Sequence, residues 1–205
     1  LEHLEEAIDR GATSLLLSRP LPAVGLPQCI VPDVRTAYAT LCEALFGYPS
    51  RRLGMVGVTG TNGKTTVTWM VRSILEAAGQ PAGLLGTIEY SDGMRSEPAT
   101  LTTPCARTLA QWLAAAVSRA TRYAAIELSS HALDQSRAAG TLLDVAVVTN
   151  ITQDHFDYHG GFDSYRAAKE RIVQQLKRRG MVVLNADDPA AVALAARTPE
   201  GVQVR

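Results

Sequence analysis

The chain has 205 residues, 46% hydrophobic and 20% charged, so it is long enough to bury one core with a small second lobe attached. Its 20 Lys and Arg balance 20 Asp and Glu, which excludes a global field that would attract nucleic acid or an anionic membrane. No apolar run reaches transmembrane length, and three cysteines without metal-ligand spacing (Cys29, Cys42 and Cys105) favour free thiols in a reducing cytoplasm.

The first fifty residues predict a small lobe. Their pattern indicates a helix, a short strand, a Pro-rich segment and a second helix, over residues 4–12, 14–17, 20–32 and 34–46. Asp33 is placed to cap the second helix, and Gly47-Tyr48-Pro49-Ser50 interrupts it. We therefore expect residues 1–50 to be the remnant of an N-terminal α/β domain and residues 51–205 to form a central domain.

From residue 52 on, apolar strands alternate with amphipathic helices. Predicted strands cover residues 53–58, 83–88, 123–128, 143–149 and 181–184. Predicted helices cover residues 65–78, 106–120, 162–179 and 189–196, and a turn falls at residues 91–93. This alternation predicts an α/β fold with a doubly wound, mainly parallel sheet.

A glycine-rich turn joins the first of these strands to the first helix, with the sequence Gly60-Thr61-Asn62-Gly63-Lys64-Thr65-Thr66. Backbone N–H groups and the helix dipole make such a turn an anion site. In a phosphate-binding loop, Lys64 contacts the β and γ phosphates and the Thr65 hydroxyl reaches Mg²⁺. Val58 stands where the general pattern has its first glycine. The turn predicts a site for ATP or a related nucleotide with Mg²⁺, and the alternative is a glycine-rich turn without a ligand.

Polar residues also follow two later strands. The strand over 123–128 ends in Glu127, and the strand over 143–149 runs into Asp154 and His155. Because the carboxyl ends of parallel strands share one edge of a sheet, both segments should lie beside the phosphate loop. Oxygen and nitrogen ligands suit Mg²⁺ or Mn²⁺. We expect Glu127 and His155 to take part in function, against the alternatives of a solvated carboxylate and a capping or core histidine.

These segments together carry a resemblance to the Mur ligase family. The family's ATP loop resembles Thr59-Gly60-Thr61-Asn62-Gly63-Lys64-Thr65, and its second signature resembles Thr149-Asn150 with Asp154-His155-Phe156-Asp157-Tyr158-His159-Gly160. Three segments are most similar to the members that add the third amino acid of the peptide: Leu101-Thr102-Thr103-Pro104, Glu127-Leu128-Ser129-Ser130-His131 and Asp157-Tyr158-His159-Gly160. The similarity runs from near Leu4 to the end of the chain.

The resemblance implies a bacterial, cytoplasmic ligase that uses ATP and two Mg²⁺ ions, and we expect a monomer. Such enzymes phosphorylate the carboxylate of UDP-N-acetylmuramoyl-L-alanyl-D-glutamate, and the amine of an amino acid, diaminopimelate or lysine, then forms the amide. Phosphorylation gives a poor electrophile a leaving group. Lys64 and the metal ions would neutralise charge on the phosphoryl group in transfer.

The family's site residues match positions along this chain. By resemblance, the nucleotide side matches Gly60, Thr61, Asn62, Gly63, Lys64, Thr65, Thr66 and Asn150. The metal side matches Thr65, Glu127, His155 and Lys169, and the catalytic set Lys64, His155 and Lys169. The UDP-muramoyl-peptide side matches Thr102, Thr103, Ser129, Gln135 and Arg137. A guanidinium forks onto carboxylate or phosphate, although an exposed helix-end arginine is the alternative for Arg137.

Lys169 depends most on the resemblance. The pattern alone makes it an ordinary helix lysine, whereas the family has a carbamylated lysine that presents oxygens to the second Mg²⁺. Asn185, Asp187 and Asp188 follow a predicted strand and stay open between a nucleotide contact and a plain turn. His131 and His159 lie inside motifs without an assigned chemistry.

The family's enzymes have three domains, and the chain begins at Leu1 rather than Met and ends at Arg205. We therefore expect a fragment that lacks the C-terminal domain and has no ligase activity alone. Two alternatives stay open: another Mur-type amide ligase, of the folylpolyglutamate or cyanophycin kind, and a nucleotide-binding module without ligase chemistry.

Overall fold

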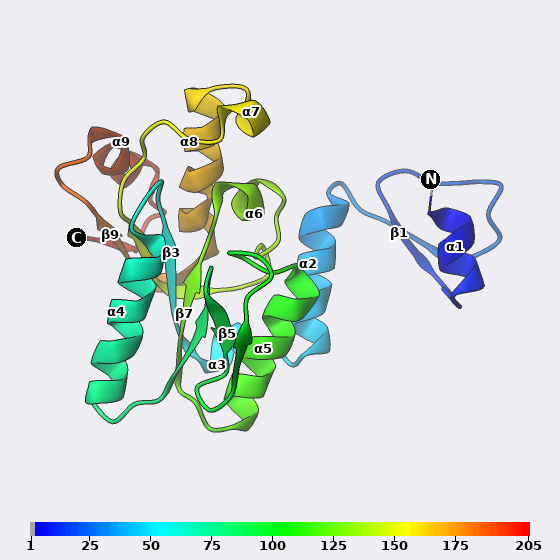
Figure 1. Cartoon of the computed structure of the whole chain (residues 1–205). Helices are drawn as coiled ribbons and strands as arrows, with labels where there is room; N and C mark the ends of the chain where they lie inside the picture. The colour runs from blue at the N-terminus through cyan, green and yellow to red at the C-terminus, as the bar shows by residue number, and fades with distance from the viewer. Residues whose placement is uncertain (1–2) are drawn as a thin grey trace.

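The N-terminal lobe contains one helix and a two-stranded sheet. The computed structural model describes residues 3–205, so Leu1 and Glu2 of the predicted lobe lie outside the described residues. Helix α1 (Leu4–Asp9) precedes strand β1 (Leu15–Leu17), which pairs in parallel with β2 (Gln28–Ile30). The sequence did not predict β2, because it lies within the Pro-rich segment. Figure 1 shows this lobe standing apart from the rest of the molecule.

Helix α2 (Val34–Leu45) joins the lobe to the larger body. The Asp33 carboxylate accepts hydrogen bonds from the backbone N–H groups of Arg35 and Thr36, so it caps α2 as predicted. Ala39 and Cys42 of α2 pack in one apolar cluster with Ala106 and Ala110 of α5 (Ala106–Ser118). Because α2 lies against α5, it contacts the central body, and the domain boundary at residue 50 stays a prediction.

The larger body is built on one eight-stranded sheet. Its strands are β3 (Gly54–Thr59), β4 (Ala82–Leu85), β5 (Glu89–Ser91), β6 (Ser96–Pro98), β7 (Tyr123–Glu127), β8 (Leu143–Val148), β9 (Leu176–Leu184) and β10 (Gln203–Val204). The order is β10-β9-β8-β3-β7-β4-β5-β6, parallel from β10 to β4, with β5 and β6 antiparallel at one edge. The predicted α/β fold with a mainly parallel sheet is confirmed.

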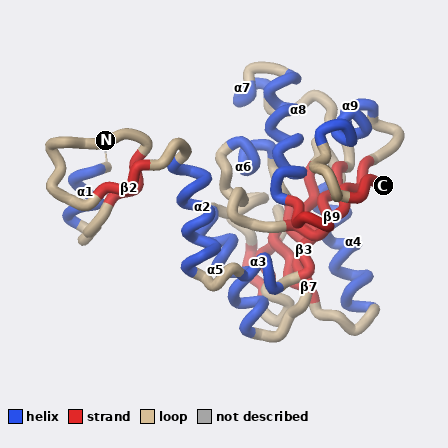
Figure 2. The backbone as a smooth tube through the Cα atoms, turned by 180° about the vertical axis from the view of Figure 1, so that it is seen from behind, coloured by secondary structure: helices blue, strands red, loops and turns tan. Residues whose placement is uncertain are grey.

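Helices cover both faces of this sheet (Figures 1 and 2). Besides α2 and α5, the body has α3 (Pro49–Arg52), α4 (Lys64–Ala77), α6 (Ser130–Asp134), α7 (Phe156–His159), α8 (Phe162–Glu170), η1 (Arg171–Gln175), α9 (Pro189–Val192) and η2 (Ala193–Arg197). The largest apolar cluster joins Leu113 of α5 and Tyr165 of α8 to Met55 and Ile126 of the sheet. Helix α4 lies against β3, β4 and β7 while none of its described residues belongs to that cluster, which places α4 on the opposite face.

The helix predicted over residues 162–179 is wrong in its second half. Helix α8 ends at Glu170, η1 follows, and β9 begins at Leu176. Leu176 pairs with Leu143 of β8, and the Lys177 Nζ donates to Asp144 Oδ2 at 2.7 Å. Leu176 follows Ile172 by one helical repeat, so the spacing fits a helix, but pairing with β8 decides the conformation.

The other predicted elements differ mainly at their ends. The strand predicted over 83–88 ends at Leu85, and the chain continues into the β5–β6 hairpin. The turn predicted at residues 91–93 begins at the last residue of β5 and continues into the hairpin loop. Cys29, Cys42 and Cys105 are free thiols, as expected. Within residues 3–205, no helix combines the length and apolar character needed to span a membrane.

Candidate active site

The glycine-rich turn lies between β3 and α4, as predicted. Gly63 adopts φ +84° and forms the N-cap of α4, while Gly60 adopts φ +153°. A Cβ on Gly60 would lie 1.9 Å from the Thr149 Oγ1, so glycine is required where the segment after β8 packs on the loop. Thr66 continues into the first turn of α4. The loop therefore presents a helix N-terminus to the carboxyl edge of the sheet.

Asn150 holds this loop in shape. Its Oδ1 accepts a hydrogen bond from the Asn62 N–H at 3.0 Å, and its backbone oxygen accepts one from the Thr61 N–H at 2.8 Å. The Thr149 hydroxyl donates to the Asn62 oxygen at 2.6 Å. The Thr61 hydroxyl in turn accepts from the Thr152 N–H at 2.9 Å. Backbone groups of the loop are thus fixed by the segment that follows β8.

Two lysines converge on the loop. The Lys64 Nζ donates to the backbone oxygens of Gly60 and Thr61 at 2.9 and 3.0 Å, and the Lys169 Nζ donates to the same Gly60 oxygen at 2.7 Å. Lys169 is 2% exposed, and burial followed by the nearby Lys64 charge lowers its pKa from 10.5 to about 7. Burial also lowers the pKa of Lys64. Two amines at one carbonyl favour an anionic partner, and a pKa of about 7 leaves Lys169 partly neutral at pH 7.

Glu127 lies opposite the start of α4. Its fully buried carboxylate accepts hydrogen bonds from the Thr65 hydroxyl at 2.9 Å and from the Thr87 N–H and hydroxyl at 2.9 and 3.0 Å. A Cβ on Gly86 would lie 2.1 Å from the Glu127 Oε1, so the carboxylate is held closely. Thr65 and Glu127 offer hydroxyl and carboxylate oxygens, the ligand type that Mg²⁺ prefers, so the residues fit that ion.

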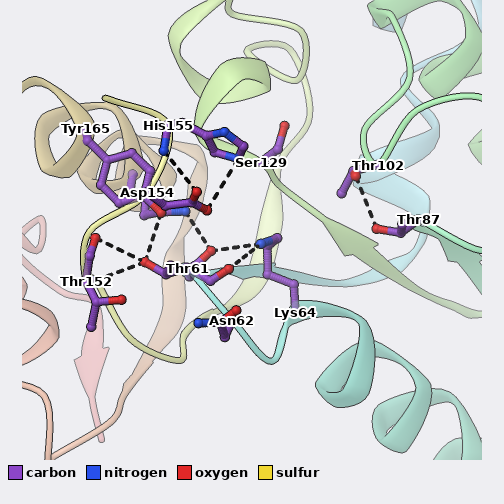
Figure 3. A network of polar contacts seen from close by, with 12 residues as sticks. Thr61, Asn62, Lys64, Thr87, Thr102, Ser129, Thr152, Asp154, His155 and Tyr165 are labelled. Carbon is purple, nitrogen blue, oxygen red and sulfur yellow. Dashed lines mark hydrogen bonds and ion pairs between the residues drawn. The ribbon is translucent and has the colours of Figure 1, made fainter. Parts of the chain in front are cut away.

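His155 occupies a different part of the edge. It forms the N-cap of α7 with φ +49°, and its Nε2 lies 3.4 Å from Asp154 Oδ2. The His155 and His131 rings lie 4.8 Å apart between centroids. Among residues 3–205, no three His, Cys, Asp or Glu side chains are grouped as a metal site. Figure 3 shows His155 and Asp154 facing Thr61 and Lys64.

The residues predicted to hold the peptide substrate come together beside Glu127. The buried Thr103 hydroxyl donates to the Glu127 backbone oxygen at 2.6 Å and accepts from the Ser129 N–H at 3.1 Å. The Arg137 Nη1 donates to the Thr103 oxygen at 3.0 Å, and its Nε and Nη2 donate to Gln135 Oε1 at 3.0 and 2.7 Å. Ser129 also caps α6. Thr102 pairs with the Thr87 hydroxyl at 3.1 Å, next to this group (Figure 3).

Several contributors were not predicted as site residues. Thr87 follows β4 and lies in none of the motifs, so the sequence offered no reason to select it. Tyr165 lies within the helix predicted over residues 162–179 and carried no predicted role, yet its hydroxyl lies 2.9 Å from the Thr61 Oγ1. Asp154 was noted beside His155, and its charge acts on both Lys64 and Lys169. A tyrosine in a helix interior and an acid in a motif carry no distinguishing spacing, so the sequence alone could not assign them.

The acidic and amide residues after β9 form a turn. The Asp187 N–H donates to Asn185 Oδ1 at 3.1 Å. Asp188 caps α9 through the Ala191 N–H at 2.7 Å and accepts from the Ile151 N–H at 3.2 Å. These contacts favour the plain turn of the two readings left open by the sequence.

A doubly wound sheet with a glycine-rich loop, two converging lysines and a buried glutamate defines an α/β domain of the phosphate-loop class. Residues 58–204 match the family described as the Mur ligase middle domain. The chain belongs to the Mur ligase family.

Relatives and solved structures agree with that assignment. The UDP-N-acetylmuramoyl-L-alanyl-D-glutamate–2,6-diaminopimelate ligases of Geobacillus thermodenitrificans and Geobacillus kaustophilus are 44% and 45% identical over 193 residues, 91% of this chain. A solved structure of a ligase with that name superposes with a TM-score of 0.80 at 29% identity, covering 98% of this chain and 41% of its own. The chain spans 39% of the length of the two Geobacillus relatives.

Proposed function

We propose that the chain is the nucleotide-binding part of an ATP-dependent amide ligase that adds diaminopimelate to UDP-N-acetylmuramoyl-L-alanyl-D-glutamate. The observation that carries this proposal is the identity of 44–45% to ligases whose names state that acceptor and that amino acid. The activity is proposed for a protein of the relatives' length, because this chain spans 39% of them. Lysine as the added amino acid is the alternative outcome of a substrate test.

In this proposal, the loop and Lys64 bind the triphosphate of ATP. The N-terminus of α4 offers its first backbone N–H groups to an anion, and Lys64 adds a positive charge beside them. Asn150 keeps the loop in shape through Asn62. The Thr65 hydroxyl and the Glu127 carboxylate would hold Mg²⁺, and His155 is proposed as a further metal ligand. Bound Mg²⁺ would supply charge neutralisation at the transferring phosphoryl group.

The proposed reaction has two steps, a phosphoryl transfer and an acyl transfer. An oxygen of the acceptor carboxylate forms a bond to the γ phosphorus of ATP, and the bond from that phosphorus to ADP breaks. The amine of the incoming amino acid then bonds to the acyl carbon, inorganic phosphate leaves, and the amine loses a proton. Lys64 is proposed to stabilise charge in the first step, and its Nζ lies at the loop, bonded to the backbone oxygens of Gly60 and Thr61.

Lys169 is proposed to carry a carbamate. Because its pKa is lowered to about 7, much of the amine is neutral at physiological pH and can attack the carbon of CO₂. The nitrogen–carbon bond forms, one proton leaves, and the product is a carboxylate on the lysine. An anion beside Lys64 replaces two like charges with an opposite pair, and its oxygens could bind a second Mg²⁺.

The acceptor is proposed to lie along Thr102, Thr103, Ser129, Gln135 and Arg137. These polar side chains are next to Glu127, so an acceptor carboxylate there would lie beside the nucleotide side of the site. Arg137 keeps N–H groups beyond the three hydrogen bonds it donates within the chain, and a guanidinium forks onto carboxylates.

Binding measurements on the chain test the proposal. Titration calorimetry would give the Kd of a non-hydrolysable ATP analogue with Mg²⁺ and the Kd of the UDP-linked dipeptide. Lys64→Met should abolish the nucleotide signal and change the dipeptide Kd by less than about threefold. Arg137→Ala should abolish the dipeptide signal and change the nucleotide Kd by less than about threefold. Dipeptide affinity that is equal in Arg137→Ala and the parent chain would contradict the acceptor site.

The carbamate has its own test. The chain is incubated with ¹³C-labelled bicarbonate and its ¹³C NMR spectrum recorded above neutral pH. A carbamate signal that disappears in Lys169→Arg supports the modification, and a spectrum identical in both chains contradicts it.

A further inference from the structure

Tyr158 joins the segment of the second signature to the acceptor side of the site. It lies in α7, three residues after His155. Its hydroxyl donates to Asp134 Oδ2 at 3.0 Å and accepts from the Gln135 Nε2 at 3.1 Å. Neither contact involves the nucleotide loop, and the proposed function assigns no role to Tyr158.

The hydrogen bonds are donated in one direction, from Arg137 through Gln135 and Tyr158 to Asp134. An ionised Asp134 can only accept, so the Tyr158 hydroxyl must donate to it and is left free to accept. Gln135 must then turn its NH₂ group toward Tyr158. Its Oε1 therefore faces Arg137, whose Nε and Nη2 donate to it at 3.0 and 2.7 Å. Reversing the Gln135 amide would bring N–H groups against a guanidinium that can only donate.

Both ends of this chain of contacts are anchored. The Arg171 Nη2 lies 3.4 Å from Asp134 Oδ1, and the Arg171 Nη1 donates to the backbone oxygen of Asp134 at 2.9 Å. At the other end, the Arg137 Nη1 donates to the Thr103 oxygen at 3.0 Å. The guanidinium is thus oriented on three of its nitrogens before any ligand arrives, which reduces the ordering cost of binding.

The ring of Tyr158 is held by the two histidines that the motifs left unassigned. The His131 and Tyr158 ring centroids lie 4.2 Å apart, and the His159 ring lies 4.8 Å from Tyr158 and 5.6 Å from His131. His131 also contacts His155. This packing places the Tyr158 hydroxyl between α6 and α7, although 41% of the residue is exposed.

We infer that Tyr158 is a positioning residue for the acceptor: it sets the orientation of the Gln135 amide, which in turn orients Arg137 toward a carboxylate of the UDP-linked dipeptide. This inference rests on the acceptor site of the proposed function. It gives His131 and His159 a packing role, and it links the segment that carries His155 to the side chains that hold the acceptor.

The test replaces Tyr158 with Phe and follows Arg137 in ¹H–¹⁵N spectra of the 205-residue chain. Arg137→Lys assigns the Nε–H signal by its loss. In Tyr158→Phe the Gln135 amide loses its acceptor, so the Arg137 Nε–H signal should shift and exchange faster with water. Tyr123→Phe is the matched control, since Tyr123 begins β7 at the end of the strand opposite Glu127 and should leave the signal unchanged.

Ligand affinity gives a second measurement. Tyr158→Phe should weaken dipeptide binding about three- to tenfold and leave the Kd of the Mg²⁺–ATP analogue within about twofold. Adding Gln135→Glu to Tyr158→Phe should restore the Arg137 signal, because a carboxylate presents oxygen to Arg137 in either orientation. A purely structural role for Tyr158 would not give that rescue.

The inference would be overturned if the Arg137 signal in Tyr158→Phe matched that in Tyr123→Phe. It would also be overturned if the parent chain binds the dipeptide and Tyr158→Phe binds it with the same affinity. If Tyr158→Phe does not fold, Asp134→Asn is read instead. An amide at position 134 can donate to the Tyr158 hydroxyl, so the direction of the hydrogen bonds between positions 134 and 137 is no longer fixed. The Arg137 signal should then move in the same sense as in Tyr158→Phe, and an unchanged signal contradicts the inference. A parent chain that binds neither ligand counts against the proposed function, while the Arg137 signal still decides the role of Tyr158.

Discussion

The nucleotide side and the acceptor side of the site are built in different ways. On the nucleotide side, backbone groups and buried side chains fix the geometry. Lys169 is 2% exposed, Glu127 is fully buried, and the amines of Lys64 and Lys169 donate to a backbone oxygen of the loop. On the acceptor side, side chains from separate segments orient one another, as Tyr158 does for Gln135, and apart from the buried Thr103 they are partly exposed. Changes on the nucleotide side should therefore affect folding together with binding, and changes at exposed acceptor residues should affect binding more selectively.

The largest effect is expected from Gly60→Ala. The new Cβ would lie 1.9 Å from the Thr149 Oγ1 and 3.2 Å from backbone atoms of Asn150, so the loop has to move. We expect loss of nucleotide binding and a decrease of about 1–3 kcal/mol in the free energy of unfolding, measured by calorimetry and urea titration. Gly79→Ala is the control: its φ is +72° but no atom lies within 4 Å, so it should cost about 1 kcal/mol and leave nucleotide affinity unchanged. Equal effects of the two substitutions would contradict this view of the loop.

A second prediction concerns the buried lysine and pH. The pKa of Lys169 is lowered to about 7 in the folded chain from an ordinary value of 10.5. Between these values the unfolded chain binds more protons, so this group makes the free energy of unfolding rise with pH, by about 1.4 kcal/mol per pH unit. Below about pH 7 both states are protonated and the full cost of burying the charge is present. Lys169→Met should remove this slope.

Urea titrations in CO₂-free buffer at about pH 7.5, 8.5 and 9.5 check the sign. The stability of Lys169→Met relative to the parent chain should be greatest at the lowest of these pH values and decline toward the highest. Parallel pH profiles for the two chains would show that Lys169 is not desolvated as the structure indicates.

The smallest effect compares neighbouring threonines on the acceptor side. Thr103→Val leaves the Glu127 backbone oxygen and the Ser129 N–H without their partner in a buried place, which should cost about 1–2 kcal/mol of stability. Thr102→Val removes one exposed contact to Thr87 and should cost less than about 0.5 kcal/mol. Urea titration of both variants measures the difference, and a Thr102→Val cost equal to that of Thr103→Val would contradict the assigned burial.

The sequence predicted what depends on short segments. The loop, its flanking strand and helix, and the convergence of Glu127 with Thr65 follow from a motif and from parallel strands ending at one edge. The helix predicted through residue 179 was wrong, since the pairing of Leu176 with Leu143 joins positions far apart in the chain. The contacts of Tyr158 could not be predicted for the same reason. Local patterns do not encode which distant side chain will complete a hydrogen bond.

The central claim is that the loop and the Thr65–Glu127 pair form one nucleotide site. A crystal structure of the chain with Mg²⁺ and a non-hydrolysable ATP analogue tests it most directly. We predict the triphosphate on the N–H groups of residues 63–66, with Lys64 on a phosphate and Mg²⁺ bound by the Thr65 hydroxyl and the Glu127 carboxylate. A nucleotide bound away from the loop, or Mg²⁺ that touches neither Thr65 nor Glu127, would contradict the account.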